Sequence, residues 1–234
     1  FKALGGYQGN TLSNVYDGFD IDIETTLPFK RDGENDDPNR IVDPLIDFIL
    51  TFKGLDSSSK YKISTSPRAS DIYGKDEKLR FMGKVIQKLK EDHDIHFDYI
   101  NPQFYNDEKN YNIPYNGTTP GEGAIQQLIQ IIKLSPSSDI SIGVLSQNAS
   151  GLRDGAIGST NNPGVHKDDL VTLWNNIIDN INKKENIDTT KLAKLGLMNW
   201  FVNMQKDSIS QCKPPEKFGD NCDDMITTWG KDFF

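Results

Sequence analysis

Apolar and polar residues alternate along the segment YDGFDIDIE, residues 16–24. Phe19, Ile21 and Ile23 share one face of an extended chain and acidic residues occupy the other, because successive strand side chains point to opposite faces. Aspartate is depleted in strands, and carboxylates this close together repel one another. An acidic strand face therefore indicates a polar interior or a catalytic surface rather than ordinary packing.

Patterns typical of helices and patterns typical of strands alternate along the rest of the chain. Apolar residues recur at helical spacing from residue 41 to Gly54, where the helix is expected to end. Further helices are predicted over residues 76–95, 123–135 and 166–184, and further strands over residues 60–67, 96–106, 139–150 and 193–203. Alternating strands and helices are typical of parallel strands joined by helical crossovers.

Two α/β architectures fit this order of elements, a doubly wound sheet and a (β/α)8 TIM barrel. Strands of a doubly wound sheet are buried on both faces, whereas barrel enzymes carry polar residues at the carboxyl ends of their strands. Polar or aromatic residues lie near the ends of most predicted strands: Glu24, Ser66, Gln103, Tyr105 and Trp200. No glycine-rich phosphate loop opens a helix, which disfavours nucleotide binding. We therefore predict the barrel.

Composition narrows the class of partner. The 234 residues carry a formal net charge of −8, and the pI is near 4.9. Nucleic acids and anionic membranes require a basic surface, so neither is an expected partner. The chain lacks the run of about 18 apolar residues that a membrane span requires, and no targeting signal is visible.

The cysteines and the glycosylation triplets indicate the cellular compartment in which the protein works. Cys212 and Cys222 flank a short loop rich in proline and glycine, which favours a disulfide clip, with two free thiols as the alternative. A disulfide indicates an oxidising compartment, and two cysteines without a neighbouring histidine are too few ligands for a metal. The triplets that begin at Asn116 and Asn148 permit N-glycosylation, although such triplets often arise by chance. We expect a secreted, extracellular protein.

The acidic strand contains the pattern D-x-x-D-x-D-x-E, in which Asp17, Asp20, Asp22 and Glu24 fill the four acidic positions. This pattern resembles the fourth-strand signature of glycoside hydrolase family 18, which includes chitinases and endo-β-N-acetylglucosaminidases. Asp17 and Gly18, at the start of the strand, are expected to be structural and to fix a turn or a buried hydrogen bond.

Further segments resemble motifs of the same family, in the family's order. FDYINPQFYN is similar to the sixth-strand motif and provides Asp98, Gln103, Tyr105 and Asn106. GLMNW is similar to the eighth-strand motif and provides Met198 and Trp200. ISTSPRAS is a weaker match to the fifth-strand motif. The sixth strand most resembles the class III-type members.

The resemblance implies a retaining, substrate-assisted glycosidase, in which the substrate's own acetamido oxygen attacks the anomeric carbon. Glu24 would be the general acid and then the base, Asp22 would hold the acetamido nitrogen, and Asp20 would share a proton with Asp22. Closely spaced carboxylates cannot all ionise, and a retained proton is what a general acid needs. Tyr105 would donate its hydroxyl to the acetamido oxygen.

The same resemblance implies a chitin or chitooligosaccharide substrate. Gln103 would position the sugar and Trp200 would form an apolar floor beneath it, with Met198 and Asn106 also in the substrate site. No metal or organic cofactor is needed, because protonation and neighbouring-group attack supply the chemistry. Two alternatives stay open, an endo-β-N-acetylglucosaminidase that acts on N-glycans and a catalytically idle, lectin-like protein that binds chitin or N-acetylglucosamine.

A family barrel would place three strands and their helices before the acidic strand, but the motif begins at Asp17. KALGG, at residues 2–6, faintly resembles the third-strand motif, yet it lies too close to Asp17 for an intervening helix. We therefore expect a TIM barrel that lacks its first strands in this chain. It would be a single catalytic domain over residues 1–234, with residues 206–234 as a C-terminal extension.

Overall fold

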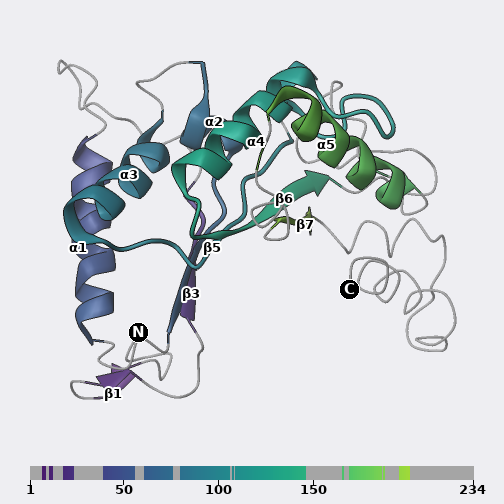
Figure 1. Ribbon diagram of the computed structural model, residues 1–234. Coiled ribbons are helices and arrows are strands. Elements are labelled where there is room, and N and C mark those ends of the chain that lie inside the picture. The colour runs from purple at the N-terminus through teal and green to yellow at the C-terminus, as the bar shows by residue number, and fades with distance from the viewer. Residues whose placement is uncertain are drawn as a thin grey trace, which may run out of the picture. The chain divides into compact units, whose positions relative to one another are not determined.

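The computed structural model describes residues 7–8, 11–12, 18–23, 39–55, 61–75, 80–105, 107, 109–145, 165, 169–185, 187 and 195–200 (Figure 1). The helices are α1 (Asn39–Leu55), α2 (Ala69–Tyr73), α3 (Phe81–His93), α4 (Glu122–Leu134) and α5 (Leu170–Lys184), with a 3-10 helix η3 (Lys109–Tyr111). The strands are β1 (Tyr7–Gln8), β2 (Thr11–Leu12), β3 (Gly18–Ile21), β4 (Lys62–Thr65), β5 (Tyr99–Ile100), β6 (Asp139–Leu145) and β7 (Leu195–Trp200). The chain divides into two compact units, residues 1–102 with 131–140 and residues 103–130 with 141–234.

Strands β3 to β7 form one five-stranded sheet, and their order across the sheet follows their order along the chain. Each of the pairs β3–β4, β4–β5 and β5–β6 is parallel. Right-handed crossovers between successive parallel neighbours place the connecting helices on the same face of a sheet, whereas a doubly wound sheet reverses its strand order at a switch point. The predicted α/β class is confirmed, and the order of the described strands is compatible with part of an α/β barrel.

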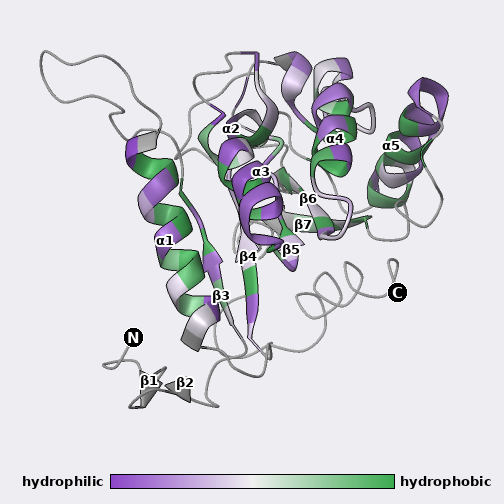
Figure 2. Cartoon of the chain, turned by 60° about the vertical axis from the view of Figure 1, so that its left-hand side comes forward, coloured by the Kyte–Doolittle hydropathy of each residue, from purple (hydrophilic) through white to green (hydrophobic). Residues whose placement is uncertain are grey.

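Two amphipathic helices cover one side of the strands in the first unit. Helices α1 and α3 pack against each other and lie on the same side of β3 and β4 (Figure 2). The buried residues of α1 recur at helical spacing: Val42, Leu45, Ile46, Ile49 and Phe52. The buried residues of α3 do the same: Phe81, Met82, Val85, Ile86 and Leu89. The helices predicted over residues 41–54 and 76–95 are therefore present as α1 and α3.

Alternation in β3 and β4 separates an apolar face from a polar face. Phe19 pairs with Ile63 in the parallel register. The ring of Phe19 contacts Phe48 and Phe52 of α1, with centroids 5.2 and 4.3 Å apart, so this face is the one that the helices cover. Asp20 is exposed and points to the opposite face, as the alternation along residues 16–24 predicted.

Three features of the fold differ from the predicted pattern. The predicted strand over residues 96–106 is short, because Pro102 has no N–H to donate to a ladder. Beyond it, Gln103 forms one parallel bridge with Gly143. Helix α2, and the antiparallel hairpin in which Tyr7 pairs with Leu12, were not predicted, since elements of two to five residues are too short to show a hydrophobic period.

The second unit contains a compact loop between β5 and α4. The buried side chain of Asn112 accepts a hydrogen bond from the N–H of Asp107 at 3.1 Å and donates one to its carbonyl oxygen at 3.0 Å. Lys184 of α5 forms an ion pair of 2.8 Å with Glu122 of α4 and holds the pKa of that carboxyl below its ordinary value.

Within the described ranges, no helix has the length and apolar character needed to cross a membrane.

Strand β3 approaches β4 closely at Gly18. A Cβ atom at Gly18 would collide with the carbonyl oxygen of Lys62 on β4, so this glycine permits a close approach of two strands. We expect Gly18→Ala to lower the free energy of unfolding by about 1–3 kcal/mol, because the strands must move apart. Urea denaturation measures the change.

Gly54 provides the matched control for this substitution. It lies in the last turn of α1, where an added Cβ meets no atom within 4 Å. Alanine is the better helix former, so Gly54→Ala is expected to leave stability unchanged or slightly raised. Equal losses in the two variants would contradict a close-approach role for Gly18.

Candidate active site

Strand β3 presents two of the predicted carboxylates on the face that α1 and α3 do not cover. Asp20 lies within β3 and Asp22 directly follows it, and both side chains are exposed. Ile21, between them, is 6% exposed and belongs to the core. The predicted alternation therefore holds up to Asp22, whereas Glu24 and Asp17 lie outside the described residues.

Asp20 has a partner that the sequence did not mark as functional. Ser64 lies opposite Asp20 in the parallel register of β3 and β4, and its hydroxyl donates a hydrogen bond to Asp20 Oδ1 at 2.5 Å. A hydrogen bond donated to one oxygen fixes the orientation of a carboxylate. The only sequence signal was the weak fifth-strand motif that contains Ser64; the register between the two strands identifies the pairing.

Hydrogen bonds at the carboxyl ends of β3 and β4 hold the residue before Asp22 in place. The carbonyl oxygen of Ile21 accepts two hydrogen bonds, from the Thr65 hydroxyl at 2.9 Å and from the Ser66 N–H at 3.0 Å. Asn101, just after β5, donates from its N–H to Thr65 at 2.8 Å and from its amide to the Ser66 hydroxyl at 3.3 Å. Asp22 therefore extends from a backbone that two neighbouring strands restrain.

The segment after β4 carries a buried carboxylate that the sequence also did not mark. Asp71 of α2 is 1% exposed, and the guanidinium of Arg68 donates to both of its oxygens at 3.3 Å. A buried carboxylate requires such a partner, because desolvation without one is costly. The pair fixes the turn from β4 into α2, at the same end of the strand as Ser66.

The remaining predicted site residues belong to the second unit. Gln103 and Tyr105 are 5% and 2% exposed, and they alternate with the fully buried Phe104. Met198 is half-buried in β7. The backbone of Trp200 ends β7. The predictions for Asn106, for the pair Cys212 and Cys222 and for residues 206–234 fall outside the described residues.

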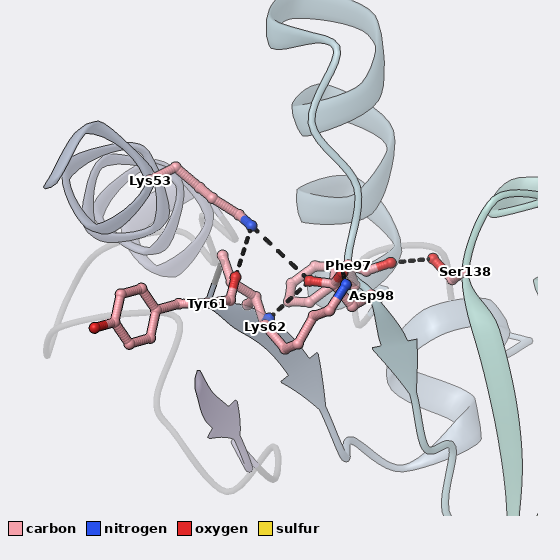
Figure 3. A network of polar contacts seen from close by, with 7 residues as sticks. Lys53, Tyr61, Lys62, Phe97, Asp98 and Ser138 are labelled. Atoms are coloured by element: carbon pink, nitrogen blue, oxygen red, sulfur yellow. Dashed lines mark hydrogen bonds and ion pairs between the residues drawn. The ribbon is translucent and has the colours of Figure 1, made fainter. Parts of the chain in front are cut away.

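Asp98, part of the sixth-strand motif, lies at the amino ends of the strands, in the network of Figure 3. Its carboxylate accepts hydrogen bonds from Lys62 Nζ at 2.7 Å and from the Ile63 N–H at 2.9 Å. Lys53 Nζ lies 3.9 Å from the same carboxylate and donates to the Tyr61 carbonyl oxygen at 3.1 Å. Asp98 therefore joins α1, β4 and β5, which is a structural role.

The contacts between Asp98 and Lys62 shift the pKa values of both side chains. Partial burial by itself would raise the pKa of Asp98, but the hydrogen bonds from Lys62 and the Ile63 N–H, together with the charge of Lys53, bring it below its ordinary value. The hydrogen bond to Asp98 is the main cause that raises the pKa of Lys62. Both groups are therefore charged at neutral pH.

Comparison of the chain with protein-family models, with curated proteins and with solved structures finds no match. Within the described part of the chain, no three histidine, cysteine or acidic side chains are grouped so that they could hold a metal ion.

Proposed function

We propose that this protein is a chitinase, which hydrolyses β-1,4-linked N-acetylglucosamine polymers with retention at the anomeric carbon. One observation carries the proposal: Asp20 and Asp22 stand exposed at the carboxyl end of a parallel strand, on the face that α1 and α3 do not cover. Catalytic residues of barrel enzymes lie at this end of the strands. Aspartates are otherwise unfavourable in a strand, so a functional reason for the row is required.

We further propose that the sheet belongs to a (β/α)8 barrel, in which β3 to β7 are the fourth to eighth strands. The sequential parallel order and the position of α1 and α3 on one side of the strands support this assignment. The polar face of β3 and β4 would then line the barrel interior. In a doubly wound sheet a second layer of helices would cover that face, and apolar residues would be expected there.

The first chemical step would break the glycosidic bond. The acetamido oxygen of the sugar attacks its own anomeric carbon, and the bond from this carbon to the leaving oxygen breaks. The carboxyl group of Glu24 gives its proton to that leaving oxygen. Asp22 accepts a hydrogen bond from the acetamido N–H, and the Tyr105 hydroxyl donates to the acetamido oxygen. The product is a cyclic oxazolinium ion with the shortened chain released.

The second step would restore the sugar. The carboxylate of Glu24 takes a proton from a water molecule, whose oxygen bonds to the anomeric carbon while the bond to the acetamido oxygen breaks. Two inversions at one carbon give net retention. Gln103 would position the sugar, and Trp200 would provide an apolar surface beneath it, with Met198 and Asn106 nearby in the substrate site. No cofactor takes part in either step.

Turnover of a fluorogenic chitotriose conjugate tests the proposal. Release of the fluorophore, with a β-configured sugar as the first product seen by NMR, would support a retaining chitinase. Chitotriose binding in calorimetry without turnover would instead support the lectin-like alternative. Release of glycans from a glycoprotein, without cleavage of the conjugate, would support the endo-β-N-acetylglucosaminidase. If the protein neither binds nor cleaves any of these substrates, all three of these functions are rejected.

Ser64 is expected to position Asp20 for this reaction. Ser64→Ala removes the hydrogen bond to Asp20, and we expect kcat on the conjugate to fall about tenfold while KM changes little, because a charged hydrogen bond is worth somewhat more than 1 kcal/mol. Ser64→Thr keeps a hydroxyl on the same face and should retain most of the rate. Equal kcat in the alanine variant and the unmodified protein would contradict the positioning role.

A further inference from the structure

The triplet Asn116-Gly117-Thr118 forms an exposed turn in the loop between β5 and α4. Thr119 donates from its N–H to the carbonyl oxygen of Asn116 at 2.9 Å, and these two residues form an isolated antiparallel bridge. Gly117 has a φ of +54°, in the left-handed region that glycine adopts without strain. Asn116 and Gly117 are both exposed, so the tip of the turn faces solvent.

The base of this turn is fixed from two directions within the second unit. The N–H of Tyr115 donates to the carbonyl oxygen of Thr119 at 2.6 Å. The side-chain amide of Asn176, on α5, donates to the carbonyl oxygen of Thr118 at 2.9 Å. Among the hydrogen bonds of the described residues, none engages the side chain of Asn116. The backbone of the triplet is therefore held in place while its asparagine side chain is available.

We propose that Asn116 is an acceptor for N-glycosylation when the chain passes through a secretory pathway. The amide Nδ2 would bond to the first sugar of a lipid-linked oligosaccharide diphosphate, the bond from that sugar to phosphate would break, and the amide proton would pass to a base of the transferase. The triplet Asn-x-Thr is the acceptor sequence for this transfer. The lipid diphosphate is the leaving group.

The structure explains why this triplet can carry a glycan. An attached oligosaccharide is bulky and hydrophilic, so it requires a surface position that folding does not cover. The exposed tip at Asn116 meets this requirement, and the bonds from Tyr115 and Asn176 involve only main-chain atoms of Thr119 and Thr118. A glycan at this position therefore displaces neither of these hydrogen bonds, and the proposal is independent of the catalytic one.

Expression of the whole chain behind a secretory leader in a eukaryotic host tests the proposal. We expect mass spectrometry of the peptides to find a glycan on Asn116 in the majority of secreted chains. Asn116→Gln and Thr118→Ala should both abolish it, whereas Thr118→Ser keeps the acceptor sequence and should retain it. Thr119→Ala, which lies outside the triplet, should also retain it and controls for disturbance of the turn.

The second triplet, at Asn148, is an internal control for a negative result. A glycan on Asn148 with Asn116 unmodified would show that the transferase reached the chain and would overturn the proposal. An unmodified Asn116 in secreted protein would overturn it in the same way, whatever the state of Asn148. Loss of the glycan in Thr118→Ser or in Thr119→Ala would show that the turn, rather than the acceptor sequence, controls the modification, and would also count against it.

Discussion

Glu24→Gln should lower kcat on a chitotriose conjugate by roughly 100- to 10,000-fold, the range that a general acid–base residue contributes. Glutamine has nearly the same shape as glutamate, but it can neither give a proton to the leaving oxygen nor take one from water. The loss should fall on kcat, and binding of the oligosaccharide should change little, since the other side chains of the site are unchanged. Fluorophore release and calorimetric binding measure the two effects separately.

Glu91→Gln is the matched control for this loss. Glu91 is exposed on α3 and accepts a hydrogen bond from Gln87, one turn earlier. Its substitution therefore removes the same charge at a position outside the acidic strand. We expect it to retain the full rate. If Glu24→Gln kept more than about a tenth of the rate, a loss well below that expected of a general acid, the assigned mechanism would be wrong. Circular dichroism of both variants establishes that the comparison is between folded proteins.

Asp98→Asn should lower the free energy of unfolding by about 2 kcal/mol, the scale of hydrogen bonds to a charged group. The neutral amide weakens the contacts with Lys62 and Lys53, and one of its two polar atoms can no longer accept a hydrogen bond. Asp92→Asn, at an exposed position near the end of α3, should change stability by less than about 0.5 kcal/mol. Urea denaturation of both variants provides the comparison.

The stability difference at Asp98 should also depend on pH. Because the pKa of Asp98 is lowered in the folded protein, the unfolded chain takes up the proton first as the pH falls. The stabilisation is fully present above the ordinary aspartate pKa of about 3.9 and is lost as the pH falls through the lower folded value. The gap between Asp98→Asn and the unmodified protein should thus be constant from neutral pH to about 5 and narrow below about 4. A gap that widened towards acid would contradict the network.

Much of the fold could be predicted because it depends on local periodicity. The α1 and α3 stripes repeat every three or four residues, and Phe19, Asp20 and Ile21 alternate in period two, so each pattern is complete within a short window. Five strands were predicted, and five form the sheet. The errors arose where an element is too short for a period, as at α2, or where one residue such as Pro102 ends a ladder.

The candidate site could be predicted less completely, because its contacts join distant segments. The acidic pattern identified Asp20 and Asp22 as a pair on one strand face. It could not identify Ser64, which is 44 residues from Asp20 along the chain and meets it only through the strand register. The motif likewise grouped Asp98 with Gln103 and Tyr105, although Asp98 lies at the amino end of β5 and holds strands together.

By itself, the sequence determined the order of strands and helices, the apolar stripe of each long helix and the acidic face of β3. These depend on the repeat of a single segment and on the chemistry of its own side chains. Only the tertiary structure decided that Ser64 holds Asp20, that Asp98 joins β4 and β5, and that Asn116 stands at the tip of a hydrogen-bonded turn. Each of these depends on which distant segments become neighbours, and that choice is made by the packing of the whole chain.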